Sequence, residues 1–253
     1  MRRALLVLLL LIARVPAAAA WPAETMAPLS RDARKLLPRS LSRLLGERES
    51  FVLEEAGRFP PDLVRSLARD LASGGLRPET IEQLSAHTNA AYRLLKEGQA
   101  DEGLLRLGGL LRIPADLSDP VLTVGPEGWP SGLTREYYAL FNANLAKMPV
   151  VLDDRAALQL TRKQLPALWQ SLVERGRPQA DVIRGALFVN GKVVDHHRLD
   201  YRSPAWAVAS LAYSRAVTGV AATWLAVWRE AGGDETRMPT AREVAPRENP
   251  EAR

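Results

Sequence analysis

The segment SPAWAVASLAYSRAVTGVAATWLAVW, from Ser203 to Trp228, is the most apolar part of the chain after residue 20 and constrains the architecture most strongly. Its opening serine can cap a helix, and Pro204 fits a first helical turn. Arg215 is the only charged residue in the stretch. A transmembrane span is the alternative, but an arginine near the middle of a bilayer is costly. The segment therefore favours a central helix that is buried by other helices on all sides.

Helical periodicity extends over much of the remaining chain. In the segment 78–96, for example, Ile81 and Leu84 recur at helical spacing after an opening proline. The further helices that such patterns predict span 61–73, 101–113, 133–147 and 154–176. Pro114 should end the helix 101–113 and open a turn, and Pro166 should kink or split the helix 154–176.

One segment departs from the helical pattern. Residues 186–194 read ALFVNGKVV, two short β-type runs around Asn190 and Gly191, which predict a hairpin with a type I′ turn. Residues 233–253 lack periodicity and are predicted to be disordered. We therefore expect a mainly α protein: a single helical domain over 21–232, with one β-hairpin near 186–194.

Residues 1–20 have the parts of a secretory signal peptide. Two arginines precede the apolar run 4–12, and four alanines occupy 17–20. The run is shorter than the roughly twenty residues that cross a bilayer. Cleavage after Ala20 would start the mature chain at Trp21 and send it to the periplasm or outside the cell. An uncleaved N-terminal anchor is the alternative.

The charge and cysteine content exclude several classes of function. The chain has 34 basic and 29 acidic residues and a net charge of +5. Arg2, Arg3 and Arg14 would leave with the signal peptide, so the rest is nearly balanced and carries no strong nucleic-acid signal. Membrane contact is compatible with the sequence but is not required. The absence of cysteine excludes disulfides, thiolate metal sites and thiol catalysis.

Two features carry a resemblance to a known family. The first is a tryptophan, Trp21, at the start of the expected mature chain. The second is LGGLLRIPADLSDPVL at 107–122, which is similar to the pattern L-G-x-x-L-H-x-x-x-D-x-x-x-P-x-H. The matching positions are Leu107, Gly108, Leu111, Asp116 and Pro120. With a further similarity at 132–138, GLTREYY, the chain resembles the zinc-dependent phospholipase C and single-strand nuclease superfamily.

The resemblance implies a helical fold and a zinc site that hydrolyses phosphoester bonds, with Trp21 and Asp116 among the metal ligands. The positions that lack the family's other ligands are Arg112, Leu122, Thr134 and Tyr138. Zinc needs three or four nitrogen, oxygen or sulfur ligands, so this set cannot rebuild the site. We expect Arg112 to pair with Asp116, four residues on, in place of the metal.

The histidines offer a second place for chemistry. His196 and His197 lie between Asp195 and a further aspartate, and imidazole and carboxylate groups are good zinc ligands or acid–base groups. Neighbouring residues of an extended segment point in opposite directions, which favours hydrogen bonds that dock the hairpin instead. His87 lies in the helix 78–96 and is expected to be a surface or capped histidine.

These observations predict an exported helical protein whose zinc site is lost and which has a non-catalytic binding or structural role. The alternative is a phosphoester hydrolase of phospholipase C or nuclease type. Its reduced metal set would consist of Trp21, Asp116 and the group Asp195, His196 and His197. We expect no cofactor, or zinc if this alternative holds. The sequence does not identify a ligand.

Overall fold

The computed structural model of the protein describes residues 21, 23–125, 128–152 and 154–238. This part of the chain is mainly helical, with a single small sheet of two strands, as the sequence predicted. None of its helices is both long and apolar enough to cross a membrane. The predicted signal peptide, 1–20, and residues 239–253 of the predicted tail lie outside the described residues.

Helix α11 (Pro204–Glu230) forms the centre of the molecule. The Ser203 side chain caps it and accepts a hydrogen bond from the backbone N–H of Trp206 at 3.2 Å. From Ala212 to Val227 every residue except Arg215 is buried. The Arg215 guanidinium donates a hydrogen bond to the backbone carbonyl of Arg175 in the helix 165–187 at 2.9 Å. The one charged side chain of the segment 203–228 therefore bonds to a neighbouring helix. The prediction of a buried central helix is confirmed.

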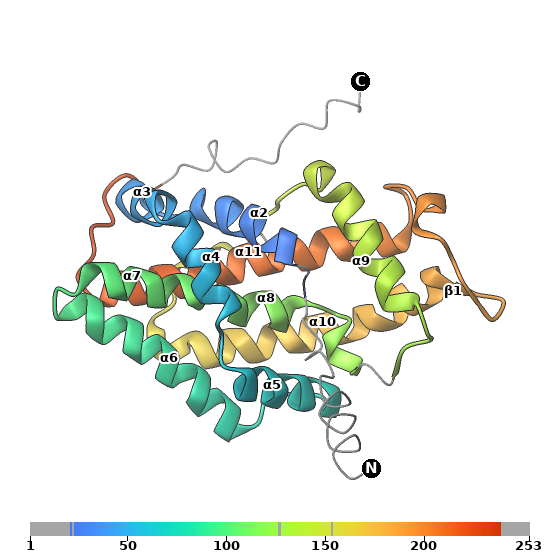
Figure 1. The fold of residues 1–253 in the computed structure, drawn as a ribbon, viewed down its shortest axis with the longest axis horizontal. Coiled ribbons are helices and arrows are strands. Elements are labelled where there is room, and N and C mark those ends of the chain that lie inside the picture. The colour runs from blue at the N-terminus through green and yellow to red at the C-terminus, as the bar shows by residue number, and fades with distance from the viewer. Residues whose placement is uncertain (1–20, 22, 126–127, 153, 239–253) are drawn as a thin grey trace, which may run out of the picture.

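The α-helices that pack most extensively on α11 are α2 (Ala23–Arg34), α8 (Arg112–Ser118) and α10 (Leu165–Leu187). Figure 1 shows α10 and α11 running along the length of the molecule, with the short α8 between them. Gly219 allows the close approach of α11 to α8, because a Cβ there would lie 2.8 Å from the Cβ of Pro114. The other α-helices of the described chain are α3 (Arg39–Glu47), α4 (Glu49–Gly57), α5 (Pro61–Ser73), α6 (Pro78–Lys96), α7 (Ala100–Gly109) and α9 (Leu133–Asn144).

The prediction around Pro114 was wrong. The helix expected over 101–113 ends at Gly109 as α7, and Pro114 lies inside the next helix, α8, instead of opening a turn. Proline is tolerated there because it is the third residue of α8, where the backbone N–H has no partner within the helix. The helix expected over 154–176 is present only in part, because the α-helix begins at Leu165 and runs on to Leu187, and Pro166 neither kinks nor splits it. Two short 3-10 helices, η4 (Arg155–Gln159) and η5 (Arg162–Gln164), precede α10, which has Pro166 in its first turn.

The predicted hairpin is present. Strand β1 (Phe188–Val189) continues directly from α10 and pairs antiparallel with β2 (Lys192–Val193). Asn190 and Gly191 form the turn with φ angles of 51° and 74°, as a type I′ turn requires. The chain after α11 folds back as far as it is described: the carbonyl of Asp234 accepts from the Trp228 indole and the Ser40 hydroxyl.

Candidate functional site

The segment that resembles the zinc motif lies in the core, beside Trp21. The Trp21 indole Nε1 donates a hydrogen bond to the carbonyl of Ala115 in α8 at 2.6 Å. Trp21 is only 1% exposed and packs edge-on against Phe141 of α9, with ring centroids 4.3 Å apart. The structure thus brings Trp21 next to the helix that carries Asp116, and the contact is made by the indole.

Asp116 is held by Arg112 in a buried ion pair. The Arg112 Nε lies 2.7 Å from Asp116 Oδ2, and the two side chains are 14% and 3% exposed. The predicted pairing of these residues is therefore confirmed. Asp116 Oδ1 is buried without a hydrogen-bond partner among the described residues. Burial raises the pKa of Asp116 and Arg112 opposes that rise, so the charge of this carboxylate depends on Arg112.

A second buried carboxylate, Asp119, follows α8. Its Oδ2 accepts from the Tyr138 hydroxyl at 2.7 Å, and its Oδ1 accepts from the backbone N–H of Val121 at 2.9 Å. Burial raises the pKa of Asp119 to about 7, with a further contribution from Asp116, although the bonds from Tyr138 and Val121 act the other way. Two carboxylates and one guanidinium therefore share this interior.

Replacing Asp119 with asparagine should make the protein less sensitive to pH. A folded-state pKa near 7, above the usual 3.8, means that the native state holds a proton that the unfolded state has released. The resulting stability is complete below about pH 4 and is lost as the pH rises through about 7. The asparagine side chain would keep an acceptor for Val121 and a polar group for Tyr138. We therefore expect the free energy of unfolding of D119N to rise relative to that of the wild type as the pH increases from about 5 to about 8, as measured by urea denaturation.

Asp70 is the matched control for this prediction, because its expected effect has the opposite sign. Burial raises its pKa, but bonds from Thr80 and Arg77 outweigh it, so the pKa is lowered overall. Its stabilising contribution is present above the usual pKa and is lost as the pH falls through the lowered value. D70N should therefore have a lower free energy of unfolding than the wild type at about pH 8. If the stabilities of D119N and D70N, each relative to the wild type, changed with pH in the same way, the opposite pKa shifts of Asp119 and Asp70 would be contradicted.

The surroundings of Asp116 do not fit a zinc ion. Its Oδ2 is occupied by a guanidinium, and both oxygens of Asp119 already accept hydrogen bonds. Zinc is held by histidine, cysteine or carboxylate ligands. The chain has no cysteine, and its three histidines lie outside α8. A fixed cation beside the carboxylate also repels a dication.

The second group, Asp195, His196 and His197, converges at the surface. It lies in the 3-10 helix η6 (His196–Arg198), which Asp195 caps by accepting from the backbone N–H of His197 at 2.9 Å. The two imidazole rings lie 4.0 Å apart, tilted by 36°. The expectation that they point in opposite directions was wrong, because the segment turns here instead of running extended. One ligand atom from each of the three residues lies within 4.8 Å of the others.

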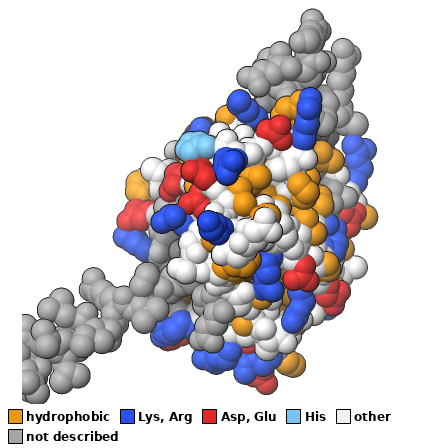
Figure 2. Space-filling view, turned by 90° about the vertical axis from the view of Figure 1, so that its right-hand side faces the viewer, with side chains coloured by type: hydrophobic (Ala, Val, Ile, Leu, Met, Phe, Trp, Pro, Cys, Tyr) orange, Lys and Arg blue, Asp and Glu red, His pale blue; other side chains and the backbone are white. Residues whose placement is uncertain are grey.

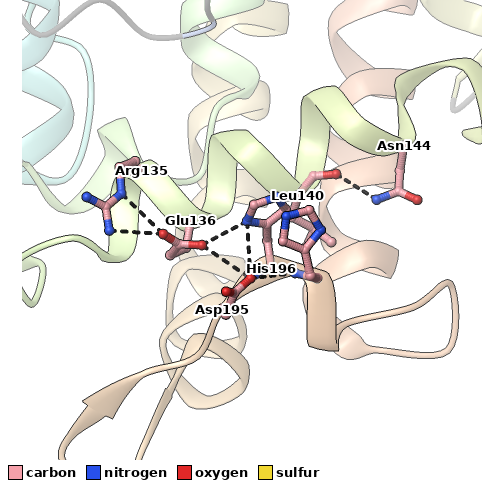
Figure 3. A network of polar contacts seen from close by, with 7 residues as sticks. Arg135, Glu136, Leu140, Asn144, Asp195 and His196 are labelled. Atoms are coloured by element: carbon pink, nitrogen blue, oxygen red, sulfur yellow. Dashed lines mark hydrogen bonds and ion pairs between the residues drawn. The ribbon is translucent and has the colours of Figure 1, made fainter.

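Glu136 of α9 completes this group and was not identified as a site residue from the sequence. Its Oε2 lies 2.9 Å from His196 Nδ1 and accepts from the His196 backbone N–H at 3.1 Å (Figure 3). The bond from the His196 ring, then that from its backbone, lowers the pKa of Glu136 to about 2. Glu136 is therefore ionised at neutral pH. It docks the turn after the hairpin onto α9, which is the hydrogen-bonding role expected for this segment.

The two groups lie on different sides of α9. Glu136 bonds to His196, whereas Tyr138 bonds to Asp119. Residues two apart on a helix point about 200° apart around its axis. Among the described residues no hydrogen bond or ion pair joins the Asp116 group to the turn at Asp195. The structure therefore presents two separate polar groups, one internal and one at the surface.

Other places in the described chain offer less specific chemistry. His87, expected at the surface, is partly buried against Phe59 with ring centroids 5.3 Å apart, and burial lowers its pKa. An open pocket of about 750 Å³ lies between the start of α3 and the turn after α11. Its lining residues are Arg39, Ser40, Arg43, Asp234, Thr236 and Arg237. With three arginines against one aspartate, a ligand of this pocket would carry negative charge.

Comparison with known proteins gave no match to any protein-family model, curated protein or solved structure. The assignment of function therefore depends on the residues and contacts described above.

Proposed function

We propose that this is an exported helical protein with a phospholipase C- or nuclease-like layout that has lost the zinc site, and that its role is binding or structural and not catalytic. The observation that carries the proposal is the ion pair between Arg112 and Asp116. Arg112 lies at the position where the zinc-dependent phospholipase C and nuclease superfamily has a histidine ligand. Its positive charge takes the place of the charge of a metal ion. Trp21 packs over the same helix through its indole.

Burial of this group supports a structural role. Asp116 is 2% exposed, Asp119 is fully buried and Trp21 is 1% exposed. A hydrolytic zinc site needs an open coordination position for water or substrate. Side chains that are bonded to one another and closed off from solvent stabilise the interior and leave no such position.

The export part of the proposal depends on residues 1–20, and it places the mature protein in the periplasm or outside the cell. A cleavable signal would leave Trp21 as the first residue. N-terminal sequencing of the protein from the extracytoplasmic fraction tests this part, and an intact Met1 would contradict cleavage.

Hydrolysis assays test the absence of catalysis. We expect the purified protein with added zinc to show no turnover of p-nitrophenyl phosphorylcholine, bis-p-nitrophenyl phosphate or single-stranded DNA above the rate of buffer with zinc. The D116N variant provides the control. Turnover by the wild type that D116N loses would overturn the proposal, because Asp116 would then belong to an active centre.

A second candidate, a phosphoester hydrolase with an altered metal set, is favoured by the convergence of Asp195, His196 and His197. The same assays separate the two candidates. Zinc-dependent turnover that persists in D116N but is lost in H197A would support a hydrolase centred on the surface group. The Asp116 group would then have no part in the reaction.

A further inference from the structure

We infer that the turn at Asp195–His197 is a binding site for a zinc-type divalent ion, in which Asp195, His196 and His197 are the ligands and Glu136 orients His196. This site is distinct from the motif that resembles the zinc enzymes. The inference goes beyond the proposed function and does not depend on it.

The convergence of the three side chains supports the inference first. Their ligand atoms lie within 4.8 Å of one another. Ligands at 2.0–2.1 Å from a tetrahedral zinc are separated by about 3.3 Å. Asp195 Oδ1 lies 3.6 Å from His196 Nδ1, so binding of an ion through His196 Nε2 requires the Asp195 side chain to rotate. Both the Asp195 and the His197 side chains are exposed and have room to do so. Two imidazole nitrogens and one carboxylate oxygen match the ligand types of open zinc sites.

The bond from His196 to Glu136 supports it second. The Glu136 oxygen that accepts from the His196 backbone N–H also lies 2.9 Å from His196 Nδ1, which is the geometry of a ring N–H that donates to a carboxylate. The Nε2 of the same ring is then the nitrogen with a free lone pair. A carboxylate that fixes the tautomer and orientation of a histidine is the usual outer partner of a metal-bound imidazole. The second bond, from the His196 backbone to the same Glu136 oxygen, holds this arrangement in place.

Access to solvent supports it third. Asp195 and His197 are exposed and His196 is partly so, which leaves room for the waters that complete the coordination. Figure 2 looks onto the end of the molecule that carries the hairpin and shows histidine beside acidic side chains at the surface. The site needs no rearrangement of the core to take up an ion.

The small number of possible zinc ligands in the chain allows zinc binding to be tested with few variants. It has no cysteine and three histidines, so only His196 and His197 are adjacent, and His87 is a natural control. Zinc binding would be measured by isothermal titration calorimetry at neutral pH on the wild type, H197A and H87A. We expect one zinc per chain in the wild type, a loss of affinity of at least about tenfold in H197A and no change in H87A.

H197A should keep its fold, because the His197 side chain is exposed and its backbone bond to Asp195 remains. D195N is the second variant if H197A is unstable. Its amide oxygen can still cap the turn while the ligand charge is removed, so it should lose at least about tenfold in zinc affinity. E136Q should lose less than either, since Glu136 orients a ligand and does not bind the ion.

No zinc binding by the folded wild type, or equal binding by the wild type, H197A and D195N, would overturn the inference. A loss of binding in H87A equal to that in H197A would overturn it as well. These outcomes are independent of the proposed function, which fails if the protein hydrolyses phosphoesters and not if it takes up one surface ion.

Discussion

Replacement of Arg112 with leucine is expected to lower the free energy of unfolding by about 3–5 kcal/mol. Asp116 is 3% exposed on its side chain, and Arg112 is the only described residue that bonds to its carboxylate. Without the guanidinium, the native state must bury an unpaired charge or take up a proton. The loss should therefore be larger at neutral pH than in mild acid, where Asp116 is more readily protonated.

The double variant R112L/D116L and the single variant R43L provide the controls. Removing both partners of a buried pair in favour of apolar groups costs little or nothing, so the double variant should recover most of the loss. Arg43 and Glu47 have the same i, i+4 spacing, but they are 73% and 57% exposed at 3.7 Å. R43L should cost less than about 1 kcal/mol. Equal losses for R112L and R43L in urea denaturation would show that the core pair is not a stabilising element.

Replacement of Trp21 with alanine is the second large effect, a loss of about 3–5 kcal/mol. Trp21 is 1% exposed and contacts Phe141 at 4.3 Å and Tyr213 at 6.5 Å between ring centroids. Its removal leaves a cavity at the junction of α8, α9 and α11 and deprives the Ala115 carbonyl of its indole donor. Thermal and urea unfolding of W21A would measure the loss.

Two further variants separate packing from hydrogen bonding at this position. W21F keeps an aromatic ring and removes the donor to Ala115, so it should cost about 1–3 kcal/mol, less than W21A. F51A removes an aromatic side chain that is 58% exposed and should change stability little. A W21A variant as stable as F51A would contradict the view that Trp21 belongs to the core.

The sequence predicted the elements that are specified by local chemistry. The apolar run of α11, with its serine cap and opening proline, and the Asn190-Gly191 turn each carry their structural signal within a few residues. The break between α7 and α8 carries no such signal. From the sequence alone, Pro114 suggests the end of a helix. In the structure Pro114 lies inside α8, where it packs closely on Gly219 of α11, a contact far along the chain that the local sequence does not reveal.

The same limit applies to the two polar groups. The pair Arg112–Asp116 was predictable because helical spacing alone brings positions four apart together. The contacts Tyr138–Asp119 and Glu136–His196 span 19 and 60 residues, so they depend on how the helices pack. The turn at His196 had a local signal that was overlooked: an aspartate side chain often accepts from the backbone N–H two residues on, as Asp195 does.

The position of α11 along the chain has a consequence for biosynthesis. This helix is the centre of the core, yet the ribosome makes it after α2, α8 and α10, the helices that pack on it. The bond from Tyr213 to Asp32 joins residues 181 positions apart. Contacts of such separation form late and slow the folding of a helical protein. The nascent chain should therefore remain loosely organised until α11 has been synthesised, because its earlier helices lack the surface on which they pack.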